Sequence, residues 1–307
     1  MVGVPPGGEQ YEISAGGYRA VVCEGGATLR LLEHAGRPLV DGFGEDEMPT
    51  AGRGQLLMPW PNRIRDGVYE FAGSTYRLGL TEPRRGNASH GLARWASWTV
   101  EEHTEASVSL VLRLVAQSGY PWVVDLHVLY DLSAEGLTVT QTATNMSATA
   151  APYACGAHPY LLAGEGPVDR WELTLPAATR LLTDDRMIPV DREPVEGTAY
   201  DFRLPRPIRD TVLDHGYGDL EHADGRVTVT VRDPESGLGA ELWGDRRVRW
   251  LQVYTGDDTT TPRRSLAVEP MTAPADAFRS GEDLVVLAPA GTAGDEHSVS
   301  WGISALG

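Results

Sequence analysis

Apolar and polar residues alternate along much of this chain. In the segment PWVVDLHVLYDL (residues 121–132), every second residue from Trp122 to Tyr130 is apolar, and Asp125, His127 and Asp131 fall on the opposite face. The segment LTVTQTATN (137–145) alternates in the same way. A period of two residues is typical of β-strands that bury one face. The pattern therefore predicts strands over both segments.

The order of these segments predicts the class of fold. In RVTVTVRDPESGLGAELWG (226–244), two alternating runs flank a turn that contains Asp233-Pro234 and Gly237. Strand-like runs follow one another without long segments of helical period, which favours antiparallel sheets packed face to face over a parallel α/β sheet. No linker, charge run or repeat divides the chain. We expect a single all-β domain over residues 1–307.

Composition limits the classes of partner. The net charge is -17 and the sequence pI is about 4.8, which argues against binding to nucleic acid or to an anionic membrane. No apolar stretch approaches the ~20 residues of a membrane helix, and the first residues do not resemble a signal peptide. The two cysteines, Cys23 and Cys155, do not form a disulfide scaffold. We expect a cytoplasmic protein with no nucleic-acid or membrane partner.

A carboxylate stands at an unusual place in SLAVEPMTAP (265–274). Leu266 to Val268 read as the end of a buried strand, and Pro270 is expected to stop further pairing. Glu269 lies between them. An ionised carboxylate is costly to desolvate, so it needs a partner, access to solvent or a chemical role.

Several loop residues are further candidates for a functional site. His158 and His90 each lie among small residues, although a lone histidine in such a place is more often structural. Trp60, between two prolines, precedes Asn62-Arg63; an aromatic face with planar donors suits a polyhydroxylated ring, although an ordinary turn explains the segment equally well. No histidine or cysteine spacing is typical of a metal site, and there is neither a serine nucleophile elbow nor a phosphate-binding loop. We expect no metal and no cofactor.

Five segments together, PWPNRI, SHGL, GAHPYL, LDHGY and AVEPMTAPADAF, resemble the aldose 1-epimerase (galactose mutarotase) family, and in particular its bacterial branch with Glu-Pro-Met-Thr. The resemblance spans nearly the whole chain and implies a large antiparallel β supersandwich. It implies that Glu269 is the general base and His158 the general acid. The sugar contacts that we expect are Arg63 and His90 around the ring oxygen, Asp214 at the hydroxyls, and Asn62, Trp60 and Tyr160.

The implied reaction is anomer interconversion of a hexose such as glucose or galactose by acid–base ring opening. We expect ionised Glu269 beside a protonated His158 whose pKa the carboxylate raises. One alternative is an anionic sugar, a hexose 6-phosphate or a sulfonated sugar such as sulfoquinovose, bound by basic residues near the site. The basic residues in question are Arg84, Arg85, Arg263 and Arg264.

We favour a neutral hexose because these arginines are also explained as solvated loop charges. The other alternative is a non-catalytic sugar-binding protein, which would need neither Glu269 nor His158. A monomer or a homodimer is expected, and the sequence does not identify the sugar.

Overall fold

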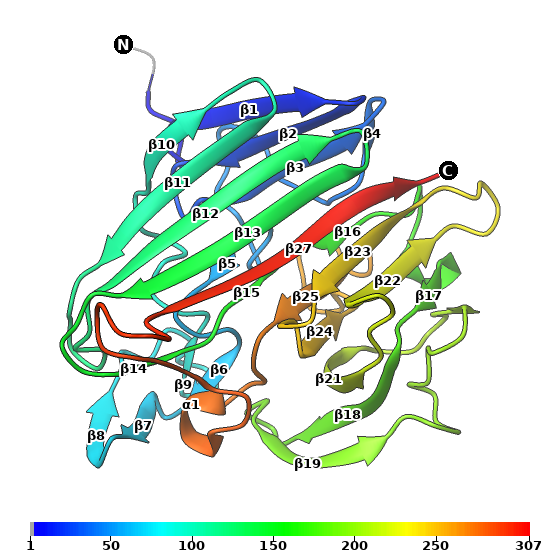
Figure 1. Cartoon of the computed structure of the whole chain (residues 1–307). Helices are drawn as coiled ribbons and strands as arrows, with labels where there is room; N and C mark the ends of the chain where they lie inside the picture. Colours follow the sequence, from blue (N-terminus) through cyan, green and yellow to red (C-terminus); the bar gives the residue numbers. More distant parts are fainter. Residues whose placement is uncertain (1–2) are drawn as a thin grey trace.

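The computed structural model describes residues 3–307, and its largest element is a nine-stranded antiparallel sheet (Figure 1). Its strands lie in the order β10 (Thr99–His103), β11 (Ser107–Leu114), β12 (Val124–Ser133), β13 (Gly136–Asn145), β27 (Glu296–Leu306), β23 (Gly239–Asp245), β22 (Arg226–Arg232), β17 (Glu172–Thr174) and β20 (Arg206–Pro207). Burial alternates along β12, where Val124, Leu126, Val128 and Tyr130 are buried. The period of two in the sequence is therefore the period of the sheet.

A second antiparallel sheet carries eight strands. Their order is β19 (Pro189–Pro194), β18 (Ala177–Thr183), β21 (Asp214–Leu220), β24 (Trp250–Tyr254), β25 (Leu266–Met271), β15 (Gly156–Ala157) and β5 (Leu56–Leu57), and β16 (Tyr160–Leu161) also pairs with β25. A four-stranded sheet contains β1 (Gln10–Ala15), β2 (Tyr18–Cys23), β3 (Leu29–His34) and β4 (Arg37–Pro38).

Three two-stranded sheets complete the strand content. They pair β6 (Arg63–Arg65) with β9 (Asn87–Ser89), β7 (Val68–Phe71) with β8 (Ser74–Arg77), and β14 (Ala151–Tyr153) with β26 (Val285–Leu287). In the part of the chain that the structure describes, helical structure is limited to α1 (Ala277–Ser280) and a 3₁₀ turn at Val168–Arg170. Among residues 3–307, no helix has the length and apolar character needed to cross a membrane.

The two large sheets share one hydrophobic core. Val139 and Trp301 from the first sheet belong to the same buried cluster as Val268 from the second. Gln141 on β13 accepts a hydrogen bond from the Trp301 indole N–H at 2.9 Å and donates one to the Gly156 carbonyl at 3.2 Å. The sheets therefore pack face to face, and the predicted all-β sandwich is confirmed.

Strand β25 departs from the prediction at its proline. It does not end before Pro270 but continues to Met271, with Pro270 opposite Leu251 of β24. On its other side, β16 and β15 pair only with the two ends of β25. Val268 donates to the Pro159 carbonyl in the gap between them at 3.2 Å. N–H groups two residues apart point to the same side of a strand, so the Pro270 nitrogen also faces this gap and no ladder hydrogen bond is lost.

Candidate active site

A cleft of about 320 Å³ opens on one face of the eight-stranded sheet. The register pairs Asp214 with Tyr254 and Gln252 with Glu269. Opposed residues project from the same face of a sheet, so strands β21, β24 and β25 all contribute side chains to the cleft lining. The volume is at the lower end of the range for small-molecule sites. This size suits a ligand as small as a single sugar.

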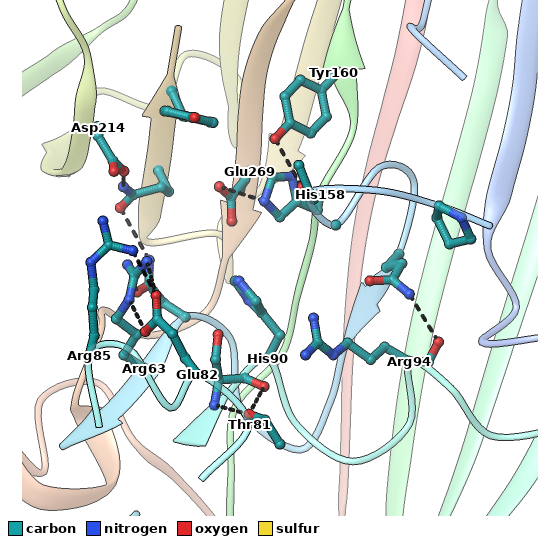
Figure 2. A pocket seen from close by; sticks show the side chains of 18 of the residues that line it. Arg63, Thr81, Glu82, Arg85, His90, Arg94, His158, Tyr160, Asp214 and Glu269 are labelled. Carbon is teal, nitrogen blue, oxygen red and sulfur yellow. Dashed lines mark hydrogen bonds and ion pairs between the residues drawn. The ribbon is translucent and has the colours of Figure 1, made fainter. Parts of the chain in front are cut away.

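Glu269 and His158 lie in direct contact in this cleft (Figure 2). The His158 Nε2 atom is 3.3 Å from the Glu269 Oε1 atom. The exposed fraction is only 3% for Glu269 and 5% for His158. The remaining polar atoms, Glu269 Oε2 and His158 Nδ1, have no hydrogen-bond partner within residues 3–307. A buried pair with unmet hydrogen-bonding capacity is costly for folding, as is common for catalytic groups.

The loop at residues 50–55 holds His158 in place. The Gly54 amide donates to the His158 carbonyl, and the His158 amide donates to the Gln55 carbonyl, each at 3.0 Å. The Tyr160 ring stacks on the imidazole with centroids 5.0 Å apart and planes 13° apart. Gly52 packs against the same ring, where an added Cβ would be 2.6 Å from the His158 Cδ2 atom. The backbone and orientation of the imidazole are therefore constrained.

A buried ion pair lies behind this stack. The Arg53 Nε and Nη2 atoms each lie 3.1 Å from the Asp41 Oδ2 atom, and the Ser265 hydroxyl donates to the same oxygen at 2.8 Å. The Arg53 guanidinium also lies 4.6 Å from the centre of the Tyr160 ring. The network fixes Tyr160 and places a cation close to His158.

The electrostatics of the empty cleft differ from the prediction. Burial raises the pKa of Glu269 well above its ordinary value, and the nearby Asp214 carboxylate adds to this effect. Burial lowers the pKa of His158 to about 3, and the cations Arg53, Arg94 and Arg63 add to the decrease. The expected rise of the His158 pKa is thus wrong, because desolvation of the imidazolium outweighs the attraction of one carboxylate. In the empty cleft, burial therefore favours the neutral forms of both side chains over their charged forms.

A chain of hydrogen bonds orders one side of the cleft. The Gln252 amide donates to Asp214 at 2.7 Å and accepts a bond from Asn62 at 3.3 Å. Asn62 in turn accepts one from the Arg63 Nη1 atom at 3.2 Å. Arg63 also pairs with Glu82 through Nε at 2.8 Å and Nη2 at 3.1 Å. These bonds fix the direction of each planar group that faces the cleft.

His90 lies next to His158, directly after β9. Its backbone has a φ of 61°, and its amide donates to the Asn62 carbonyl at 2.8 Å. The two imidazole rings meet edge to face, with centroids 5.6 Å apart. Burial lowers the pKa of His90 well below its ordinary value, so this imidazole is neutral and offers one donor and one acceptor.

The structure places some predicted residues elsewhere. Trp60 is 2% exposed and packs in the hydrophobic core, 5.7 Å from the Phe278 ring, and does not line the cleft. The flanking prolines restrict its backbone but do not decide which side the ring faces. Arg263 pairs with Asp169 and Asp257 outside the cleft.

Of the other three arginines in question, only Arg85 lines the cleft. Its guanidinium pairs with Glu82 at 2.9 Å. Arg84 and Arg264 are exposed and lie outside the lining, and Arg264 lies 3.4 Å from Asp41.

Several lining residues were not predicted. Among them are Gln252, Tyr254, Asp258, Glu82, Arg94 and Trp95. Gln252 lies on β24, a strand that was not predicted from the sequence, and its pairing with β25 reveals its place in the cleft. Arg94 follows His90 by four residues, just beyond the SHGL motif, and was the more accessible signal. No group of three or more His, Cys, Asp or Glu side chains within residues 3–307 is arranged to hold a metal ion.

The fold and the cleft together define a class, a β-sandwich protein with a carboxylate–imidazole pair in a sugar-sized site. The family model for aldose 1-epimerase matches residues 9–298. The chain belongs to the aldose 1-epimerase family, and it is an isomerase that interconverts the anomers of an aldose.

Similar proteins cover most of the chain. The YihR protein of Escherichia coli K12 is 36% identical over 91% of this chain and 89% of its own. Human galactose mutarotase is 27% identical over 87% of this chain and 84% of its own. The solved structure of the GalM/aldose epimerase homologue from C. elegans has a TM-score of 0.85 at 22% identity. The match covers 97% of this chain and 98% of that chain.

Proposed function

We propose that the protein acts on a free aldopyranose, with Glu269 as general base and His158 as general acid. The observation that supports this assignment is the 3.3 Å contact between two buried side chains that both line the cleft. Opening the ring removes the proton of the C1 hydroxyl and delivers a proton to the ring oxygen. Rotation about C1–C2 and closure then reverse both transfers, so nothing is consumed.

The proton must first move within the pair. Burial favours neutral Glu269 and neutral His158 in the empty cleft, whereas ring opening uses ionised Glu269 and protonated His158. Both forms contain one proton and carry the same net charge, so they differ only by transfer across the 3.3 Å contact. A sugar hydroxyl that donates to the carboxylate favours its ionised form. Substrate binding therefore prepares the reactive arrangement.

The remaining polar groups bind the sugar. Asp214 accepts hydrogen bonds from hydroxyls, and Arg63 and Asn62 offer donors whose directions are set by their neighbours. His90 is neutral and sits beside the acid, where it contacts the region of the ring oxygen. Tyr160 supports His158 by stacking, because its hydroxyl already donates to the Ala51 carbonyl at 2.9 Å.

Exchange spectroscopy by NMR on glucose and galactose at anomeric equilibrium tests the proposal. The protein is expected to accelerate exchange, and His158→Asn is expected to reduce kcat by roughly 10²- to 10⁴-fold. Addition of EDTA is expected to leave the rate unchanged. Sugar binding without faster exchange would instead identify a non-catalytic sugar-binding protein, and near wild-type exchange by His158→Asn would remove His158 from the assigned role.

A further inference from the structure

Arg94 differs from the other guanidinium groups of the cleft. Arg63 and Arg85 share the Glu82 carboxylate. The Arg94 side chain has no carboxylate within 4.0 Å and no hydrogen-bond acceptor in the part of the chain that the structure describes, although it lines the cleft and is only partly exposed. In Figure 2 its guanidinium points toward the interior of the site, on the opposite side of His90 from Arg63.

The local backbone holds Arg94 in this position. The backbone N–H groups of Leu92 and Ala93 donate to the Met58 carbonyl at 2.7 and 3.1 Å. The Arg94 carbonyl accepts a hydrogen bond from the Gln55 side-chain amide at 3.2 Å. The guanidinium lies 5.7 Å from the centre of the Trp95 ring, which also lines the cleft. The cation is therefore presented by a fixed segment.

The charges around the cleft leave Arg94 uncompensated. Arg63 and Arg85 carry two positive charges, which the Glu82 and Asp214 carboxylates balance. Burial disfavours a charge on either member of the Glu269–His158 pair. Asp258 also lines the cleft but is exposed to solvent. A neutral hydroxyl would satisfy N–H donors of Arg94 without neutralising its charge, whereas an anion would do both.

We propose that Arg94 binds an anionic substituent of the aldose, such as a phosphate, sulfonate or carboxylate carried at C6. This inference rests on the proposed function, because it places C1 and the ring oxygen at the Glu269–His158 pair. C6 is attached to the carbon beside the ring oxygen, so a group on C6 extends past His158. Binding of an anion there also neutralises a cation that lowers the pKa of His158, which favours the protonated acid.

Arg94→Gln tests the proposal through substrate preference. NMR exchange rates are measured for glucose, glucose 6-phosphate, 6-deoxy-6-sulfoglucose and glucuronate, with wild type and variant. At least one of the three anions is expected to exceed glucose in kcat/KM, and Arg94→Gln is expected to reduce that preference by about 10- to 150-fold, the worth of a hydrogen bond to a charged group. The three anions distinguish phosphate, sulfonate and carboxylate as the group recognised.

Matched variants separate this effect from others. Arg113→Gln removes a guanidinium outside the cleft, where it pairs with Asp125, and is expected to leave the preference unchanged. Arg94→Lys is expected to restore part of it, and 0.5 M salt is expected to reduce it in the wild type. Equal losses for glucose and the anions, or a wild type that prefers glucose, would overturn the proposal while preserving the mutarotase assignment. Absence of exchange with every sugar would instead reject the proposed function itself.

Discussion

Replacement of Glu269 by glutamine separates the catalytic role of this side chain from its cost to folding. The amide keeps the shape of the carboxylate but does not act as a general base, so kcat is expected to fall by roughly 10²- to 10⁴-fold. Folding is expected to improve. Glu269 is 3% exposed and burial raises its pKa. The folded state therefore disfavours the ionised carboxylate, which glutamine lacks, and each pKa unit of such a rise corresponds to about 1.4 kcal/mol.

The gain in stability depends on pH. Because the pKa of Glu269 is raised in the folded protein, its cost is absent below the unfolded pKa of about 4.3 and grows as the pH rises above it. With an unfolding entropy of about 2.1 cal/mol/K per residue, 1 kcal/mol corresponds to about 1.5 °C in a chain of 307 residues. We therefore expect Glu269→Gln to raise the Tm at pH 7, by about 2 °C for each 1.4 kcal/mol of relieved cost, and by much less at pH 4.

Exchange NMR and calorimetry on the same samples measure both effects. Glu241→Gln is a matched control, because burial also raises the pKa of Glu241 but this residue lies on β23 outside the cleft lining; its kcat is expected to equal that of the wild type. Near wild-type turnover by Glu269→Gln would refute the assignment of the base. The change in Tm, variant minus wild type, is the second readout. A change that is smaller at pH 7 than at pH 4 would refute the account of the burial of Glu269.

Three other predictions follow from the site and the core. The rate should fall at low pH near the His158 pKa of about 3, as the pair gains a second proton. The alkaline limb should lie above the ordinary pKa of a glutamate, because the pKa of Glu269 is raised; a maximum confined between pH 4.3 and 6.5 in the kcat profile would contradict this order of pKa values. The double variant Arg53→Met/Asp41→Asn removes a cation near His158, so the acid limb should move to higher pH, and an unchanged profile would show that Arg53 has no electrostatic effect. Trp60→Phe should lower the Tm and leave KM unchanged, since the indole is part of the core; a large rise in KM at constant Tm would return Trp60 to the sugar site.

The local sequence was sufficient to predict several strands and most of the residues proposed for the site. A period of two residues fixes which side chains share a face, so the buried face of β12 was readable from residues 121–132. The motifs around Arg63, His90, His158 and Glu269 were quoted in order, and all four of these residues line one cleft. Periodicity and short motifs depend on neighbours in the chain, which is why they were accessible without the fold.

Tertiary structure decided the features that depend on distant contacts. Trp60 faces the core and Pro270 faces a gap in the ladder, and both outcomes depend on segments remote in sequence. The unpaired charge of Arg94 follows from where the carboxylates of other loops lie. The low pKa of His158 has the same origin, because enclosure by the loop at residues 50–55 and three convergent guanidinium groups desolvate and disfavour the imidazolium. Burial and charge balance are sums over the whole fold, so no local pattern contains them.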